Sequence, residues 1–150
     1  MSNYVELYKR LSKFPGGASI FNIALARKSP YVSQLKPKVS ALREGYAQVD
    51  VANRRAVHNH LGTVDSNALF TLSQLVMGLA LETVIPKDRR WIPVGAELEY
   101  LKLAKSSVSA VCDCSRLDFY QDKLNIDVVV RDSNGEEVQK AIVKVHLSSK

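Results

Sequence analysis

The segment of residues 64–85 constrains the fold of this chain more than any other part of the sequence. It contains no proline and one glycine, Gly78, and either Thr63 or Asp65 can serve as its N-cap, so it is predicted to form one long helix. Its side chains are apolar nearly all round, which indicates a helix buried on most sides. Because polar residues interrupt it and the longest apolar run covers only residues 75–81, a membrane span is not expected.

Four segments after this helix alternate apolar and polar residues, as is typical of strands with one buried face. They lie near residues 94–100, 108–114, 124–130 and 138–147, and a further extended segment near residues 46–57 precedes the helix. The sequence Asp132-Ser133-Asn134-Gly135 predicts a tight turn before the last strand. Short connections predict an antiparallel meander, with a register break near Lys140.

The predicted architecture is an α+β domain in which a strongly curved antiparallel sheet wraps the long helix. Residues 1–45 are predicted to be a helical extension packed outside the sheet, and residues 46–149 the core. A length of 150 residues fits one domain, and 46% hydrophobic with 24% charged residues is the balance of a soluble globular protein. No second domain is expected.

The excess of positive charge lies in the N-terminal part of the chain. The formal net charge is +6; residues 1–44 hold eight Lys and Arg against two Glu, and residues 45–150 hold thirteen charges of each sign. Such a segment can meet nucleic acid, a membrane surface or an anionic cofactor, or be an ordinary solvated helical surface. No nucleic-acid partner is expected, because aromatic and basic residues are not interleaved and no known motif is present.

The cysteines and histidines do not predict a cofactor site. Cys112 and Cys114 form neither a disulfide framework nor a zinc site and are expected to be buried thiols in a reducing cytoplasm. His58, His60 and Asp65 supply too few ligands on one face for a metal. With no glycine-rich phosphate loop and no secretory signal, we expect no cofactor, no metal and a cytoplasmic location.

The sequence around the start of the long helix resembles the central segment of hotdog-fold acyl-CoA thioesterases. The matching stretches are Asn59-His60-Leu61-Gly62-Thr63-Val64-Asp65-Ser66-Asn67-Ala68-Leu69 and Leu72-Ser73-Gln74-Leu75-Val76-Met77-Gly78. The resemblance is closest to the branch related to the phenylacetyl-CoA-pathway thioesterase and to families known only as thioesterase-like. It extends over about residues 45–149 and implies a hotdog fold, in which the curved sheet wraps the helix; the N-terminal helices resemble an extension found in some members.

The resemblance implies a catalytic site at the start of the helix. Asn59 matches an asparagine that orients substrate or water, and Gly62 matches the glycine of a tight turn. The step at which backbone N–H groups receive the thioester oxygen reads Asp65-Ser66-Asn67 here. The resemblance therefore implies substrate contacts at Gly62, Thr63, Ser66 and Asn67. The family's catalytic acid falls on Gln74, whose amide can only hold water or substrate by hydrogen bonds.

Several of these residues have two interpretations. Asp65 can replace the missing acid as a general base, or it can be an N-cap alone. Gln74 can line the site or make a structural hydrogen bond within an apolar helix. Arg54, Arg55 and Arg90 can bind the phosphates of coenzyme A, or be ordinary surface charges.

The predicted function is hydrolysis of a fatty or aromatic acyl-CoA thioester. The alternative is a hotdog protein that binds acyl-CoA or another lipid-like ligand without catalysis, because Gln74 lacks a carboxylate. We also expect a homodimer or a dimer of dimers, since a single curved sheet leaves its edges uncovered.

Overall fold

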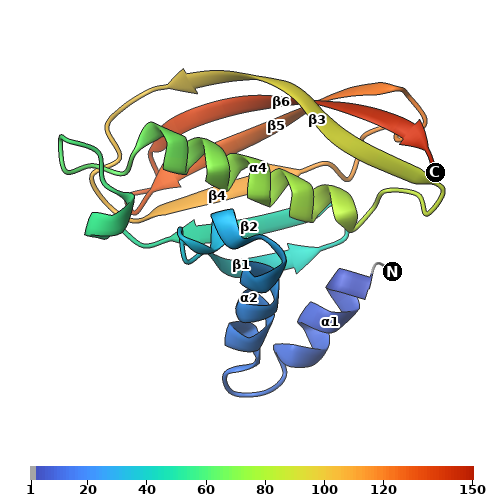
Figure 1. Ribbon diagram of the computed structural model, residues 1–150, viewed down its shortest axis with the longest axis horizontal. Helices are drawn as coiled ribbons and strands as arrows, with labels where there is room; N and C mark the ends of the chain where they lie inside the picture. The colour runs from blue at the N-terminus through green and yellow to red at the C-terminus, as the bar shows by residue number, and fades with distance from the viewer. Residues whose placement is uncertain (1–2) are drawn as a thin grey trace.

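The computed structural model describes residues 3–150 and has the predicted α+β architecture (Figure 1). The helices are α1 (Asn3–Leu11), α2 (Gly17–Lys28), α3 (Pro30–Ser33) and α4 (Ser66–Glu82), with a 3-10 turn at Arg55–Val57. The strands are β1 (Lys38–Arg43), β2 (Tyr46–Val51), β3 (Arg89–Tyr100), β4 (Val108–Asp113), β5 (Lys123–Asp132) and β6 (Glu137–Ser149). The long helix and the strands after it are therefore confirmed, and the helix is a few residues shorter than expected.

The six strands form one antiparallel sheet in the order β1-β2-β4-β5-β6-β3 (Figure 1). Strands β4, β5 and β6 make the expected meander. The register break near Lys140 is also confirmed: Gln139 lies opposite Val130 but Glu137 lies opposite Arg131, so Val138 is the extra residue.

The expectation that all four later strands form a meander is wrong for β3. This strand pairs with β6 at the edge of the sheet, and residues 101–107 carry the chain back to β4 in the middle. The crossing is anchored at Ala104, which is buried and whose carbonyl accepts a hydrogen bond from the Val64 N–H. Alternation of apolar residues predicts a strand but not its neighbour, so the pattern could not reveal this connection.

The helical extension is shorter than predicted, because β1 lies within residues 1–45. Val39 and Leu42 of this strand are buried, and β1 pairs with β2. A register shift between Val39 and Ala41 interrupts the alternation, which hid the strand from pattern analysis. The sheet thus begins at Lys38, and the N-terminal helices end before it.

Helix α4 lies across the concave side of the sheet (Figure 1). The helix packs mainly on β2 and β4, and its Leu72, Val76 and Ala80 are inaccessible to solvent. The helix ends where Thr83 Oγ1 donates to the Ala80 carbonyl and accepts from the Gly45 N–H at 2.7 Å. This bond ties the end of α4 to the turn between β1 and β2. Among residues 3–150, no helix is both long and apolar enough to cross a membrane.

The two edges of the sheet differ. Along β1, the N-terminal helices cover the edge, and Asn22 Oδ1 accepts a hydrogen bond of 3.0 Å from the Val39 N–H. Strand β3 pairs with β6 on one side and has no strand partner on the other within the described chain. Several of its large apolar side chains are exposed, among them Ile92 at 57% and Val94 at 60%.

Candidate functional site

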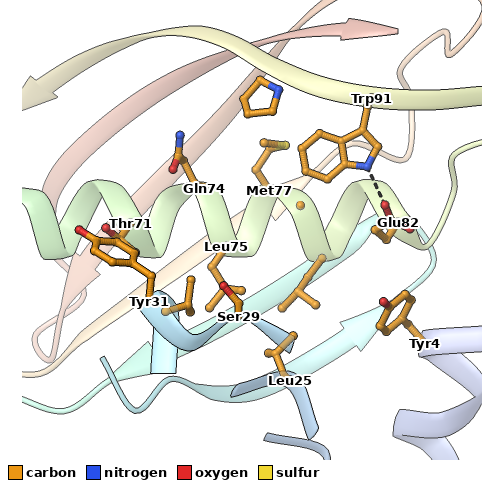
Figure 2. A pocket seen from close by; sticks show the side chains of 14 residues that line it. Tyr4, Leu25, Ser29, Tyr31, Thr71, Gln74, Leu75, Met77, Glu82 and Trp91 are labelled. Atoms are coloured by element: carbon orange, nitrogen blue, oxygen red, sulfur yellow. Dashed lines mark hydrogen bonds between the residues drawn. The ribbon is translucent and has the colours of Figure 1, made fainter. Parts of the chain in front are cut away.

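A groove of about 430 Å³ runs along the face of α4 that the sheet leaves uncovered (Figure 2). Helix α4 forms its floor, the N-terminal helices one wall and β3 the other. Figure 2 shows Trp91 approaching from β3 on one side, and Tyr4, Leu25 and Tyr31 from the N-terminal helices on the other. Most of the lining side chains are apolar, and both the size and the lining are those of a small-molecule site.

The wall formed by β3 depends on a contact between Trp91 and α4. The indole Nε1 of Trp91 donates a hydrogen bond of 2.7 Å to Glu82 Oε1 (Figure 2). The ring lies over Gly78, where an added Cβ would be 3.2 Å from its edge. Glycine at position 78 therefore lets the indole approach the helix closely. Glu82 is the one carboxylate among the residues that line the groove.

Gln74 lies on the floor of this groove, between Thr71 and Gly78. Its side chain is exposed, and the amide makes no hydrogen bond with the described residues 3–150. The amide is thus available to a ligand. Helical spacing brings Asn67, Thr71, Gln74 and Gly78 onto one stripe of α4, which is the stripe that faces away from the sheet.

A second cavity, of about 230 Å³, lies at the N-terminal end of α4. Asp65, Asn67 and His58 line it, and Tyr31 and Thr71 line both this cavity and the groove. The two spaces are therefore neighbours along the same face of the helix.

Asp65 is the N-cap of α4. Its Oδ1 accepts a hydrogen bond of 2.7 Å from the Asn67 N–H, and its carbonyl accepts from the Leu69 N–H. The carboxylate is half-buried, and the cap uses only one of its oxygens. The geometry of a cap is thus present, and Oδ2 remains for a second partner. The Asn67 N–H is already engaged by the cap, which removes it from the donors for a thioester oxygen.

His58 is a site residue that sequence reasoning missed, having considered it only as a metal ligand. Its backbone forms a bridge with Val64, and its Nε2 shares a hydrogen bond with Asn53 Oδ1. The bridge places the imidazole in the same cavity as Asp65. The sequence did indicate an extended segment before the turn. An extended pattern does not show, however, into which cavity the side chain of His58 points. Residues 3–150 contain no group of three or more side chains placed to hold a metal ion.

Asn59, Gly62 and Thr63 form the turn that precedes the helix. Asn59 Oδ1 accepts hydrogen bonds from the N–H groups of Leu61 and Thr63, at 3.0 and 3.2 Å. Gly62 has φ +73°, a left-handed conformation that favours glycine. None of the three lines the groove or the smaller cavity. The structure therefore does not bring Asn59 together with Gln74.

The three predicted arginines lie at opposite ends of α4. Arg54 donates to the Gln34 carbonyl, which ties the chain before the 3-10 turn to the residue that follows α3, and the exposed Arg55 follows it. Arg90 lies on β3 near Glu82, where its Nε donates to Ser148 Oγ at 3.0 Å. Because the 17 residues of α4 span about 25 Å, Arg90 is remote from Arg54 and Arg55 within one chain.

Ser66 and the two cysteines complete the predicted residues. Ser66 is exposed at the first position of α4, and its carbonyl accepts a hydrogen bond of 3.4 Å from the Tyr100 hydroxyl. Cys112 and Cys114 are buried free thiols, as expected, and they do not line the groove. The hydrogen bond with Cys114, together with burial, raises the pKa of the Cys112 thiol above its ordinary value.

Comparison with known proteins gives a family and a fold. A family model described as "Domain of unknown function (DUF4442)" matches residues 17–147, whereas no curated protein matches the chain. A crystal structure from a genomics project is similar at 30% identity and a TM-score of 0.86, over 98% of this chain and 99% of that one.

Two further crystal structures share the fold at lower identity. A thioesterase from Haemophilus influenzae has 14% identity and a TM-score of 0.74, over 84% of this chain and 87% of that one. A Pseudomonas aeruginosa protein of unknown function, described as a probable thioesterase, has 20% identity and a TM-score of 0.76, over 91% and 97%. The predicted hotdog fold is thereby confirmed.

Proposed function

The chain belongs to the family described as Domain of unknown function (DUF4442), and from this premise we propose that it is an acyl-CoA thioesterase acting on fatty or aromatic acyl groups. One observation carries the proposal: an apolar groove on α4 adjoins a cavity that is lined by a carboxylate, Asp65, and an imidazole, His58. The thioesterase and the probable thioesterase that share this fold support the same reaction class. Fold alone would not, because one scaffold serves many functions.

In this proposal the acyl group occupies the groove and the thioester lies where the groove meets the smaller cavity. Leu25, Leu75 and Trp91 supply apolar contacts to the acyl group. The thioester carbonyl then lies between Thr71 and Asn67, within reach of the Gln74 amide. The side-chain amides of Asn67 and Gln74 are the donors that stabilise the oxyanion, because the Asn67 N–H is held by the cap.

Asp65 is proposed as the general base. Its free oxygen takes a proton from a water molecule as that water attacks the carbonyl carbon, which gives a tetrahedral oxyanion. The carbon–sulfur bond then breaks, and the thiolate of coenzyme A leaves with the proton that Asp65 had taken. Asn59, Gly62 and Thr63 act indirectly, since their hydrogen bonds hold the turn that presents Asp65.

A homodimer completes the proposed site. The exposed edge of β3 carries Ile92, Val94, Leu98 and Tyr100, and burying such an edge against a second copy removes both unpaired backbone groups and apolar surface. Pro93 and the bulge that follows it leave residues 95–100 as the regular stretch for pairing.

Two-fold pairing of this edge would also bring together Arg54, Arg55 and Arg90, which lie far apart within one chain. An antiparallel pair of β3 strands would bring the Arg90 end of one copy next to residues 101–107 of the other. That loop is bonded to Val64 at the start of α4 and to Asn53, which directly precedes Arg54 and Arg55 in the chain. The three arginines would then surround one entrance and bind the phosphates of coenzyme A. Acyl-CoA is the only ligand that this site requires, and the buried free thiols support a cytoplasmic location.

One observation favours a binding protein without catalysis as the second candidate. Gln74 replaces the acid of the resembling family, and Asp65 is already engaged as a cap. In that case the groove would hold acyl-CoA without hydrolysis.

A thiol-release assay with short, long and aromatic acyl-CoAs separates the two candidates. We expect turnover of at least one class, reduced at least about 10²-fold in Asp65→Asn. Asp127→Asn is the matched control, because Asp127 is exposed on β5, whose neighbouring side chain Val128 faces the core. Saturable binding with no turnover of any acyl-CoA would replace the enzyme with the binding protein.

A further inference from the structure

Helices α1 and α2 form a hairpin that projects from the body of the protein beside β1, with residues 12–16 at its far end (Figure 1). The connection is tightly built: Gly16 has φ +79°, and a Cβ on Gly17 would lie 1.7 Å from the Leu11 carbonyl oxygen. Inside the hairpin, the rings of Tyr8 and Phe21 meet edge to face at 5.3 Å. The tip is thus a defined structure.

Large apolar side chains are exposed on this hairpin. Phe14 at the tip is 69% exposed, and Ile20, in the first turn of α2, is 57% exposed. Ile23 lies one turn further on the same face of α2, while Phe21 and Leu25 face the protein. Neighbouring apolar side chains that are left in water usually mark an interaction surface.

The charges around these side chains have one sign. Arg10 lies in the last turn of α1 and Lys13 in the connection, so both precede Phe14 closely in the chain, and Arg27 continues the exposed face of Ile20 and Ile23. Glu6 is the only acidic residue in the first 43 positions of the sequence. A partner that covers this surface must therefore be apolar within and negatively charged outside.

We propose that the tip of the α1–α2 hairpin docks the protein on an anionic lipid bilayer. Phe14 and Ile20 would enter the boundary between headgroups and acyl chains, and Arg10 and Lys13 would lie among the lipid phosphates. A second copy of the chain fits less well, because two tips in contact would bring the same cations together. A nucleic acid would use the cations but leave the exposed apolar side chains without a role.

The position of α2 gives this docking a consequence, which rests on the proposed function. One face of α2 carries Ile20 and Ile23 outward, and the other carries Leu25 into the wall of the groove. A long-chain acyl thioester dissolved in the membrane surface would therefore pass along one short helix to reach the groove. Docking itself requires no hydrolysis, so it can be tested without substrate.

Flotation of the full chain with lipid vesicles tests the proposal. We expect binding to vesicles with about one third phosphatidylglycerol, weak binding to pure phosphatidylcholine, and release at high salt. The double variant Arg10→Gln/Lys13→Gln should bind roughly 25-fold more weakly, since each cation near an anionic surface contributes about a factor of five. Phe14→Ser/Ile20→Ser should bind at least about tenfold more weakly.

The matched control is Lys105→Gln/Lys123→Gln, which removes two exposed cations outside the hairpin and should bind as the parent does. Circular dichroism checks that each variant is folded. Equal binding to neutral and anionic vesicles, or the same loss in the control variant, would overturn the proposal. So would a loss confined to the charge variant with no effect of Phe14→Ser/Ile20→Ser, which would identify a general polyanion site. Vesicle binding is measured without substrate, so its outcome does not depend on whether the protein hydrolyses acyl-CoA.

Discussion

Trp91 and Glu82 join the edge strand β3 to the last turn of α4 through a single hydrogen bond of 2.7 Å. The residues are nine positions apart, but they belong to elements that are separated by a turn and run in different layers. The bond fixes the indole over Gly78 and so fixes one wall of the groove. Loss of the indole N–H would leave a half-buried carboxylate without this partner.

Trp91→Phe should lower the free energy of unfolding by about 1–3 kcal/mol, because the hydrogen bond and part of the buried ring are lost together. Glu82→Gln should cost less, about 1 kcal/mol or below, because its amide oxygen still accepts from the indole. Urea unfolding measures both. Equal costs for the two variants would mean that the negative charge of Glu82, rather than the ring of Trp91, stabilises this wall.

We predict that substitutions on the open edge of β3 change the oligomeric state of the protein. Val94→Lys/Leu98→Lys places two cations on each copy at the proposed interface, so light scattering should report the mass of a single chain where the parent reports two or four. Ile23→Lys is the control, because Ile23 is also an exposed apolar residue but lies on the α1–α2 hairpin. A parent protein that is monomeric at micromolar concentration would contradict the dimer and the shared arginine entrance.

The buried thiol of Cys112 leads us to predict that the folded protein loses stability at alkaline pH. The pKa of its thiol is raised above 9.0 in the folded protein by the hydrogen bond with Cys114 and by burial. Folding therefore favours the protonated thiol. This contribution is complete below the pKa of the unfolded thiol and declines as pH rises above it.

Between neutral pH and about pH 10, the urea midpoint of the parent should fall more steeply than that of Cys112→Ala. The variant is less stable at neutral pH because it leaves a small cavity, so the slope with pH is the quantity to compare. Thiol reagents should label Cys112 only after unfolding. Parallel slopes would show that folding does not raise the pKa of the Cys112 thiol.

Local pattern was enough to predict α4 and the strands β4 to β6, because their burial follows periods of 3.6 and 2 residues along the chain. Two features escaped it. β1 contains a bulge beside Val39 that breaks the period, and β3 takes β6 as its partner through a connection that depends on the rest of the sheet. Neither a bulge nor the choice of neighbouring strand leaves a periodic signal.

The residues of the candidate site were likewise predicted only in part. Gln74 and Asn67 were predicted from the resemblance to hotdog thioesterases, and the structure adds that helical spacing puts them on one stripe of α4. Trp91 was missed because it reaches the groove only after β3 takes its place at the edge, and His58 because a bridge with Val64 decides where it lies. Side chains that enter a site from a distant element are fixed by tertiary contacts, which one sequence does not display.

Two substitutions at Asp65 separate its proposed role as a general base from its role as the N-cap of α4. Asp65→Asn keeps an oxygen that can accept from the Asn67 N–H, so the free energy of unfolding should change by less than about 0.5 kcal/mol. The rate of acyl-CoA hydrolysis should nevertheless fall about 10²-fold or more, because the general base is lost. Asp65→Ala removes the cap as well and should cost about 1 kcal/mol of stability in addition.

Gln74→Glu tests the same mechanism from the other direction. It places a carboxylate on the floor of the groove at the position of the acid in the resembling family, and the exposed side chain can ionise without a large desolvation cost. Activity should rise, and the double variant Asp65→Asn/Gln74→Glu should recover part of what Asp65→Asn loses. Turnover that is unchanged in Asp65→Asn would show that Asp65 only caps the helix. A gain in Gln74→Glu on its own would then mean that the groove already aligns the thioester and lacks only a base.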